Sequence, residues 1–224
     1  MSKKELIISG LLLAFFGGFF DIYCLIYRGG KFAFLQTGNL LYLAFDLING
    51  DMQSVNIILI SFSSFIVGLV IAYLVTFFNK DKSKYTKIIL LTLIFLLITP
   101  NYFFKEIINL NYNVITIVSL GMIGGILLES FREYYVNFTS TMMTNNTKML
   151  VHSLLDGIFY KENKELRKSA IYLGVIISFV LGVISYSLIY KFANYQFLAP
   201  LIGQLIILIL LILEIKTLRC QNEK

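Results

Sequence analysis

The sequence has few charged residues and few of the residues from which common catalytic and metal sites are built. Charged residues make up 14% of its 224 residues, and it has two cysteines, one histidine and no tryptophan. One histidine cannot build a histidine-rich zinc site, and the signatures of zinc proteases, phosphate-binding loops and serine hydrolases do not occur. Cys24 and Cys220 are too far apart for a local metal or redox motif. The sequence therefore has no recognisable catalytic motif, and we expect no metal and no cofactor.

Hydrophobic residues, by contrast, make up 58% of the chain, and its mean hydropathy is +0.79. This leaves too little polar surface to coat a soluble protein of this size. A helix needs roughly 20 mostly apolar residues to cross a membrane. Six stretches approach this length: 6–27, 54–78, 87–103, 112–128, 169–190 and 197–213. We expect an all-α integral membrane protein with one membrane domain, 1–224, and the lipid bilayer as its main partner.

The net charge of +6 could indicate nucleic-acid binding. Its lysines and arginines, however, form short clusters beside apolar segments, which is typical of residues that orient a protein in the membrane. We therefore expect no nucleic-acid partner. The lysine-, isoleucine- and asparagine-rich composition favours a bacterial plasma membrane as the location.

The two halves of the chain are related by an internal repeat. Residues 37–43 align with 144–150, and the same offset aligns several glycines. The glycines aligned in this way are Gly17 with Gly124, Gly18 with Gly125, Gly50 with Gly157 and, after a longer second connection, Gly68 with Gly182. Repeat A then covers about 5–104 and repeat B about 112–216, and each reads as helix, short interrupted segment, helix, helix.

The short segments, 32–50 and 138–157, are apolar, but a Thr-x-Asn element interrupts each of them. About 11 helical residues follow each break, enough for roughly half of a bilayer core. If both segments re-enter on one side, the lysine clusters at 80–87 and 161–168 lie in the cytoplasm with both termini, as the positive-inside rule favours. Three spanning helices per repeat then make the repeats inverted, so we expect six spanning helices and two re-entrant half-helices.

The breaks are candidate solute sites, because the first turn of a half-helix presents free N–H groups and a positive dipole end. Thr37 and Asn39, and Thr144 and Asn146, are suited to capping these starts. Gly38 permits a close approach or an unusual backbone conformation, and Asn145 takes its place in the second half. Alternatively, these side chains only satisfy backbone groups that lipid cannot.

Polar residues elsewhere extend the candidate pathway. Asp21 lies well inside the first apolar stretch, where a carboxylate is costly unless it is protonated, paired or hydrated. We expect it to bind a cation or proton. Helical spacing places further polar residues on one face of each half-helix: Asn39, Tyr42, Asp46 and Asn49 in the first, and Asn146, Ser153 and Asp156 in the second. Lys148 and His152 are on other faces of the second, and Gly17, Gly18, Gly68, Gly124, Gly125 and Gly182 are expected to allow close helix packing.

The pattern Gly18-Phe-Phe-Asp21, Gly29-Gly30-Lys-Phe32, and Gln36-Thr37-Gly38-Asn39-Leu40 resembles the YoaK-like bacterial membrane proteins, or domain of unknown function 1275. The resemblance implies a small-molecule permease. Our leading hypothesis is a transporter or channel for a small polar solute, anionic or neutral, between the two repeats. One alternative is a membrane module that assembles with a partner or senses lipid, and another is an intramembrane enzyme that acts on lipid. The oligomeric state stays open, with a homo-oligomer among the alternatives.

Overall fold

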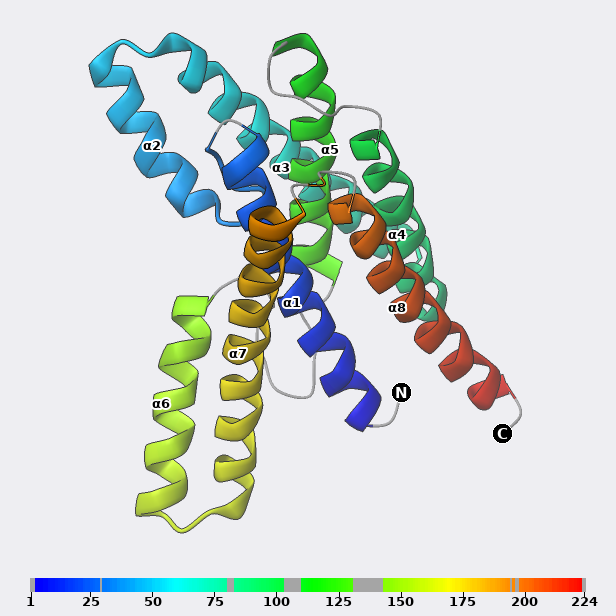
Figure 1. Cartoon of the computed structure of the whole chain (residues 1–224). Helices are drawn as coiled ribbons and strands as arrows, with labels where there is room; N and C mark the ends of the chain where they lie inside the picture. Colours follow the sequence, from blue (N-terminus) through cyan, green and yellow to red (C-terminus); the bar gives the residue numbers. More distant parts are fainter. Residues whose placement is uncertain are drawn as a thin grey trace.

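The computed structural model is a bundle of helices (Figure 1). It describes residues 3–28, 30–79, 83–102, 110–130, 143–193, 195 and 198–222. Within these ranges the helices are α1 (Lys3–Tyr27), α2 (Gln36–Asn49), α3 (Met52–Phe78), α4 (Ser83–Ile98), followed by a short 3₁₀ turn (Thr99–Tyr102), α5 (Leu110–Ser130), α6 (Met143–Phe159), α7 (Asn163–Phe192) and α8 (Leu198–Asn222). The predicted all-α fold is confirmed for this part of the chain.

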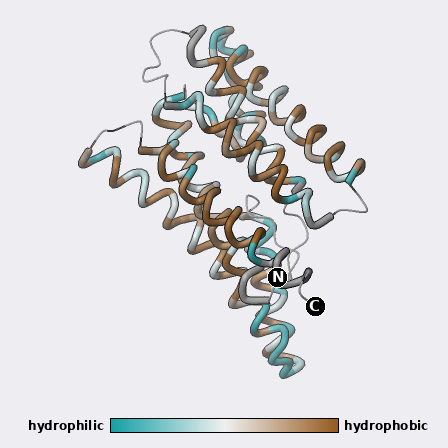
Figure 2. Tube along the Cα trace, turned by 90° about the vertical axis from the view of Figure 1, so that its right-hand side faces the viewer, coloured by the Kyte–Doolittle hydropathy of each residue, from teal (hydrophilic) through white to brown (hydrophobic). Residues whose placement is uncertain are grey.

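Four helices are long and apolar enough to cross a membrane. The apolar segments are Ile7–Tyr27, Met52–Phe78, Asn163–Phe192 and Leu198–Lys216. The segments in α4 and α5, Tyr85–Asn101 and Val114–Glu129, are shorter, so four of the six expected spans have full length. Figure 2 shows hydrophobic residues along most of the helices, with hydrophilic residues mainly near their ends.

Two helical hairpins form the most prominent local units. In the first, α2 and α3 are joined by Gly50 and Asp51: Gly50 adopts a left-handed conformation (φ 75°), and its N–H donates to Asp46 and Leu47 carbonyls. The Asp51 side chain then caps α3 by accepting from the N–H of Ser54. The turn is tight because the residue that ends α2, Gly50, is followed directly by the residue that caps the start of α3, Asp51.

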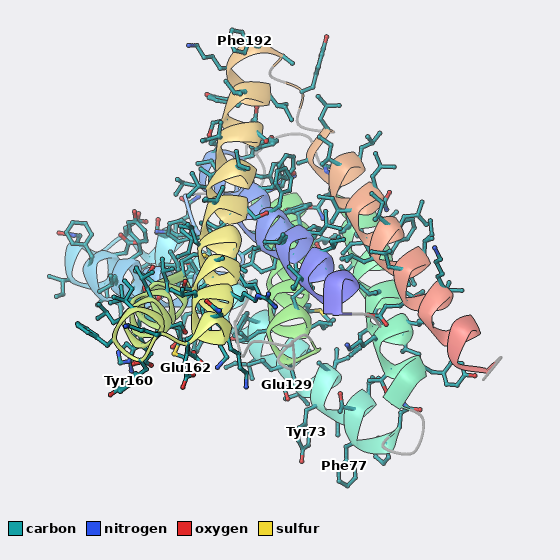
Figure 3. The ribbon with its side chains drawn as sticks, turned by 90° about the horizontal axis from the view of Figure 1, so that it is seen from below. Tyr73, Phe77, Glu129, Tyr160, Glu162 and Phe192 are labelled. Atoms are coloured by element: carbon teal, nitrogen blue, oxygen red, sulfur yellow. The ribbon has the colours of Figure 1, made fainter. Side chains whose placement is uncertain are left out.

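In the second hairpin, α6 and α7 are joined by residues 160–162, and here Lys161 has the positive φ, 55°. Figure 3 shows Tyr160 and Glu162 at this turn and Phe192 at the far end of α7. Gly157, which aligns with Gly50, lies inside α6 and packs against Leu166 of α7. In Figure 1 the two hairpin turns lie at opposite ends of the molecule.

Each half packs against the other through its long helices. Helix α1 packs along α7, and glycines allow the two backbones to touch. A Cβ added at Gly18 would collide with the Phe179 carbonyl, and one added at Gly182 would collide with the Phe15 carbonyl. Such contacts matter in a membrane, because lipid is as apolar as a protein core and close packing must hold helices together.

The pairing of α3 with α5 repeats this arrangement. A Cβ at Gly125 would collide with the Phe65 carbonyl, and one at Gly68 would collide with the Met122 carbonyl. Gly125 aligns with Gly18, and Gly68 aligns with Gly182. The two crossings are therefore built by aligned residues in exchanged halves.

Candidate functional site

The polar residues of the first half gather around the linker between α1 and α2. The linker leaves helical geometry after Arg28, whose N–H donates to the Cys24 carbonyl at 2.8 Å, and residues 31–35 precede the first turn of α2. Its backbone groups cannot bond to one another as they would in a helix, so side chains must satisfy them.

Asn39 provides most of this support. Its Oδ1 accepts from the N–H of Phe32 at 2.9 Å, and its Nδ2 donates to the Phe32 carbonyl at 2.8 Å. The Nδ2 also donates to Oε1 of Gln36, whose own amide donates to the Ala33 carbonyl. With both ends of its amide engaged and no exposed surface, Asn39 holds the linker against α2.

Asp21 supports the same linker from α1. Its Oδ1 accepts from the N–H of Phe34 at 2.8 Å, and the residue is buried. A carboxylate inside an apolar helix thus has a structural partner, and Asp21 is placed beside the first break as a second polar support.

The prediction that Thr37 and Asn39 cap α2 is wrong. The helix begins before them, with Leu35 at the cap position and no side-chain cap, and the Thr37 side chain is exposed. Asn39 lies in the first turn and points back to Phe32 instead. Gly38 serves close approach, because a Cβ there would be 2.9 Å from the Phe32 ring.

A buried ion pair joins the linker to the middle of α2. Nζ of Lys31 is 2.8 Å from Oδ2 of Asp46, and only about a tenth of either side chain is exposed (8% and 12%). The Lys31 ammonium also lies 4.5 Å from the centre of the Tyr42 ring, a cation–π distance. Asp46 and Tyr42 share the helix face of Asn39, as the spacing predicts.

Arg28 is the second basic residue at the linker, and it is 1% exposed. Its guanidinium donates to the Tyr23 hydroxyl at 2.5 Å. We did not identify Arg28 or Lys31 as candidate site residues from the sequence, because both follow closely on the first apolar stretch, where basic residues usually orient a helix in the membrane. Asp46 was an available signal, because a carboxylate on the same helical face as Asn39 favours a cationic partner nearby.

Arg28 and Lys31 line a small pocket between α1, the linker, α3 and α5. The pocket is small, with a volume of about 10 Å³. Its other lining residues are Cys24, Phe32, Ala33, Ser61, Ile117 and Leu120. Apolar walls with a few converging polar groups are typical of small-molecule sites.

The second break has different chemistry. Residues 138–142 of the predicted segment lie outside the described residues. In α6, Asn146 and Ser153 are buried, like the aligned Asn39 and Asp46. Ser153 cannot form an ion pair, however, and Leu128 stands at the position that aligns with Asp21.

The remaining predicted residues of α6 lie on its surface. Thr144 is exposed. So are four residues that form one polar stripe along the helix: Asn145, Lys148, His152 and Asp156. The assignment of Asp156 to the buried face of Ser153 is therefore wrong, since Asp156 lies with His152. The first-half residues Asp21, Asn39 and Asp46 share one neighbourhood, and the polar stripe is a separate one.

Among the described residues, no group of three or more His, Cys, Asp or Glu side chains could hold a metal ion.

The comparisons with known proteins give one match. The family model described as "Protein of unknown function (DUF1275)" matches residues 9–213, nearly the whole chain. No curated protein and no solved structure matches the chain. The match agrees with the resemblance carried by Gly18, Asp21 and the Gln36–Asn39 segment, and the chain belongs to the DUF1275 family.

Proposed function

We propose that this protein is a channel or carrier for a small polar solute, anionic or neutral, in a bacterial plasma membrane. The proposal depends on one observation: four charged side chains are buried around the α1–α2 linker of a mostly apolar helical protein. They are Asp21, Arg28, Lys31 and Asp46. Ionisable residues at membrane depth are costly and typically mark solute, ion or proton pathways.

In this proposal the two halves form inverted repeats around the pathway. The exchanged glycine contacts of Gly18 with Phe179 and of Gly125 with Phe65 support a twofold relation between the halves. The hairpin turns at opposite ends of Figure 1 support opposite orientations. Six helices would then span, α2 and α6 would be re-entrant, and both termini, which lie at one end of Figure 1, would be cytoplasmic.

The polar stripe of α6 supports a water-filled path. Helix α6 packs along α7, a candidate membrane span, yet Lys148 and His152 are exposed. Lipid cannot solvate these groups, whereas water in a pathway can. The aligned positions on α2 are Leu41 and Phe45, 76% and 66% exposed, which suit contact with lipid.

Single cysteines can test whether water reaches the stripe. In a background with Cys24→Ala and Cys220→Ser, His152→Cys should react with a charged, membrane-impermeant thiol reagent, whereas the matched Phe45→Cys should not. Reaction at His152→Cys should also reduce solute flux in proteoliposomes. The flux panel would contain small anions and small neutral polar solutes, with protein-free vesicles as the baseline.

Asp21→Asn belongs in the same assay. Asparagine keeps an oxygen that can accept from the Phe34 N–H but cannot carry a charge. If Asp21 couples flux to a proton or cation, the variant should fold normally and lose dependence on the ion gradient. The transport proposal fails if no solute in the panel moves and both cysteine positions stay unreactive.

A second candidate function is a non-transporting membrane module. This function is favoured by the hydrogen bonds that Asp21 and Asn39 accept from backbone N–H groups of the linker. Their polarity would then serve the fold alone, and the exposed stripe of α6 would face a partner protein. A single partner that co-purifies in fixed ratio, and whose removal makes His152→Cys reactive, would favour this function over transport.

A further inference from the structure

Among the described residues that line the linker pocket, two are basic and none is acidic. Arg28 and Lys31 both line it, and the two nearby carboxylates do not: Asp46 pairs with Lys31, and Asp21 bonds to the linker backbone. We propose that this pocket binds a small monovalent anion, of the size of a halide, nitrate or formate. The inference depends on the proposed function in that it names the class of solute at the same site.

The donors are held in place before any anion arrives. The Tyr23 hydroxyl bonds to one amino group of the Arg28 guanidinium, and the Tyr23 ring lies 5.2 Å from its central carbon. The Lys31 ammonium is positioned by Asp46 and by the Tyr42 ring. Guanidinium and ammonium groups are donors only, so they favour an anion over a cation, and pre-positioned donors bind with less loss of side-chain freedom.

Size and wall chemistry narrow the class of anion. The pocket volume of about 10 Å³ is far below the roughly 300–1,000 Å³ of sites for drug-sized ligands, which excludes large metabolites. Ile117 and Leu120 form apolar walls that offer an anion no hydration, so weakly hydrated monovalent anions fit best. The Ser61 hydroxyl, now 3.4 Å from the Phe32 carbonyl, can donate to the anion instead.

Thermal unfolding tests for binding independently of flux. The purified protein would be melted in detergent with circular dichroism as the readout, in sodium nitrate, chloride or formate against sodium gluconate at equal ionic strength. A ligand that binds only the folded state raises its stability, so at least one small anion should raise Tm above the gluconate value. Arg28→Gln should raise the Kd for this anion about tenfold or more, because a charge-assisted hydrogen bond is worth about 1.5–3 kcal/mol.

Ser61→Val provides a second variant in case Arg28→Gln fails to fold. The aligned position in the second half is Val175, and the added methyl groups would occupy pocket space without removing a charge. Ser63→Val is the matched control, since Ser63 is an exposed neighbour on the same helix. Small anions should stabilise the control as they stabilise the unmodified protein, and they should stabilise Ser61→Val less.

Two outcomes separate this inference from the transport proposal. Equal Tm in all four salts overturns the anion site, and transport stands if neutral solutes still cross the proteoliposomes. Anion stabilisation that Ser61→Val removes supports the site even if no flux is found, in which case the transport proposal alone fails. Equal stabilisation of Ser61→Val and Ser63→Val also overturns the site, because the anion would then bind elsewhere.

Discussion

Helices α2 and α6 occupy aligned positions in the two halves and share one buried register, but their polar chemistry differs. Asn39 and Asn146 are both fully buried. Seven residues further along, α2 has Asp46 in an ion pair with Lys31, whereas α6 has Ser153. The position is therefore conserved in burial between the halves and different in charge.

On their exposed faces, by contrast, α2 is the more apolar helix and α6 is the more polar one. Helix α2 exposes Leu41 and Phe45, and α6 exposes Lys148 and His152 at the aligned positions. One half thus keeps its charges inside, and the other keeps them on the surface. The close glycine contacts between α1 and α7 and between α3 and α5 are made by aligned residues. The two halves therefore share their helix packing, whereas the buried polar site occurs in the first half.

Removing the ion pair should have the largest effect. Asp46→Ser gives α2 the residue that α6 has at this position, but it leaves Lys31 buried without its carboxylate. Breaking one side of a buried pair costs about 3–5 kcal/mol, so we expect a large decrease in Tm, measured by circular dichroism in detergent. Lys31→Met combined with Asp46→Leu should restore much of it, because no lone charge stays buried.

The matched control for this change is Asp156→Ser on the exposed stripe of α6, which should leave Tm nearly unchanged. Equal Tm for Asp46→Ser and Asp156→Ser would show that the buried pair does not distinguish the two helices.

Alanine substitutions at the aligned glycines of the two helix crossings should lower Tm equally in both halves. Gly18→Ala and Gly125→Ala each place a carbon against a backbone carbonyl, of Phe179 and Phe65 respectively. A backbone cannot move aside as a side-chain end can, and overpacking typically costs about 1–3 kcal/mol. Both variants should therefore lower Tm by similar amounts.

Gly174→Ala on α7 is the control for the crossings, since among the described residues its added carbon would meet Leu11 Cδ2 alone, at an ordinary 3.4 Å. A loss of stability in Gly18→Ala without one in Gly125→Ala would contradict a shared packing frame.

Features that depend on periodicity or alignment could be predicted from the sequence. The apolar stretches predict the long helices α1, α3, α7 and α8, and the helical spacing predicts that Asn39 and Asp46 share one face of α2. The repeat also aligns Gly18 with Gly125, which the structure places at equivalent crossings. These features follow from local spacing, which sequence records directly.

Features that depend on the path of the linker could not be predicted. Arg28 and Lys31 have the sequence context of residues that leave the membrane, and only the folded linker brings them to Tyr23 and Asp46. Asn39 has the position of a helix cap, but its amide bonds better to the extended Phe32 backbone. Side chains that stabilise irregular backbone find their partners in space, and spacing along the chain does not identify them.

The smallest expected effect is a difference in Tm between alanine and asparagine substitutions at the two aligned glycines of the hairpins, Gly50 and Gly157. Gly50 has a left-handed φ of 75° and open space around it, whereas a Cβ at Gly157 would lie 2.6 Å from Leu166 Cδ2. Asparagine tolerates the left-handed region better than alanine does, so Gly50→Asn should have a higher Tm than Gly50→Ala, by an amount that reflects about 1 kcal/mol. At Gly157 the backbone is helical, and the larger asparagine would collide more with Leu166, so alanine should be tolerated better. The order of the two substitutions should thus reverse between the hairpins, and the same order at both positions would contradict the different roles of the two glycines.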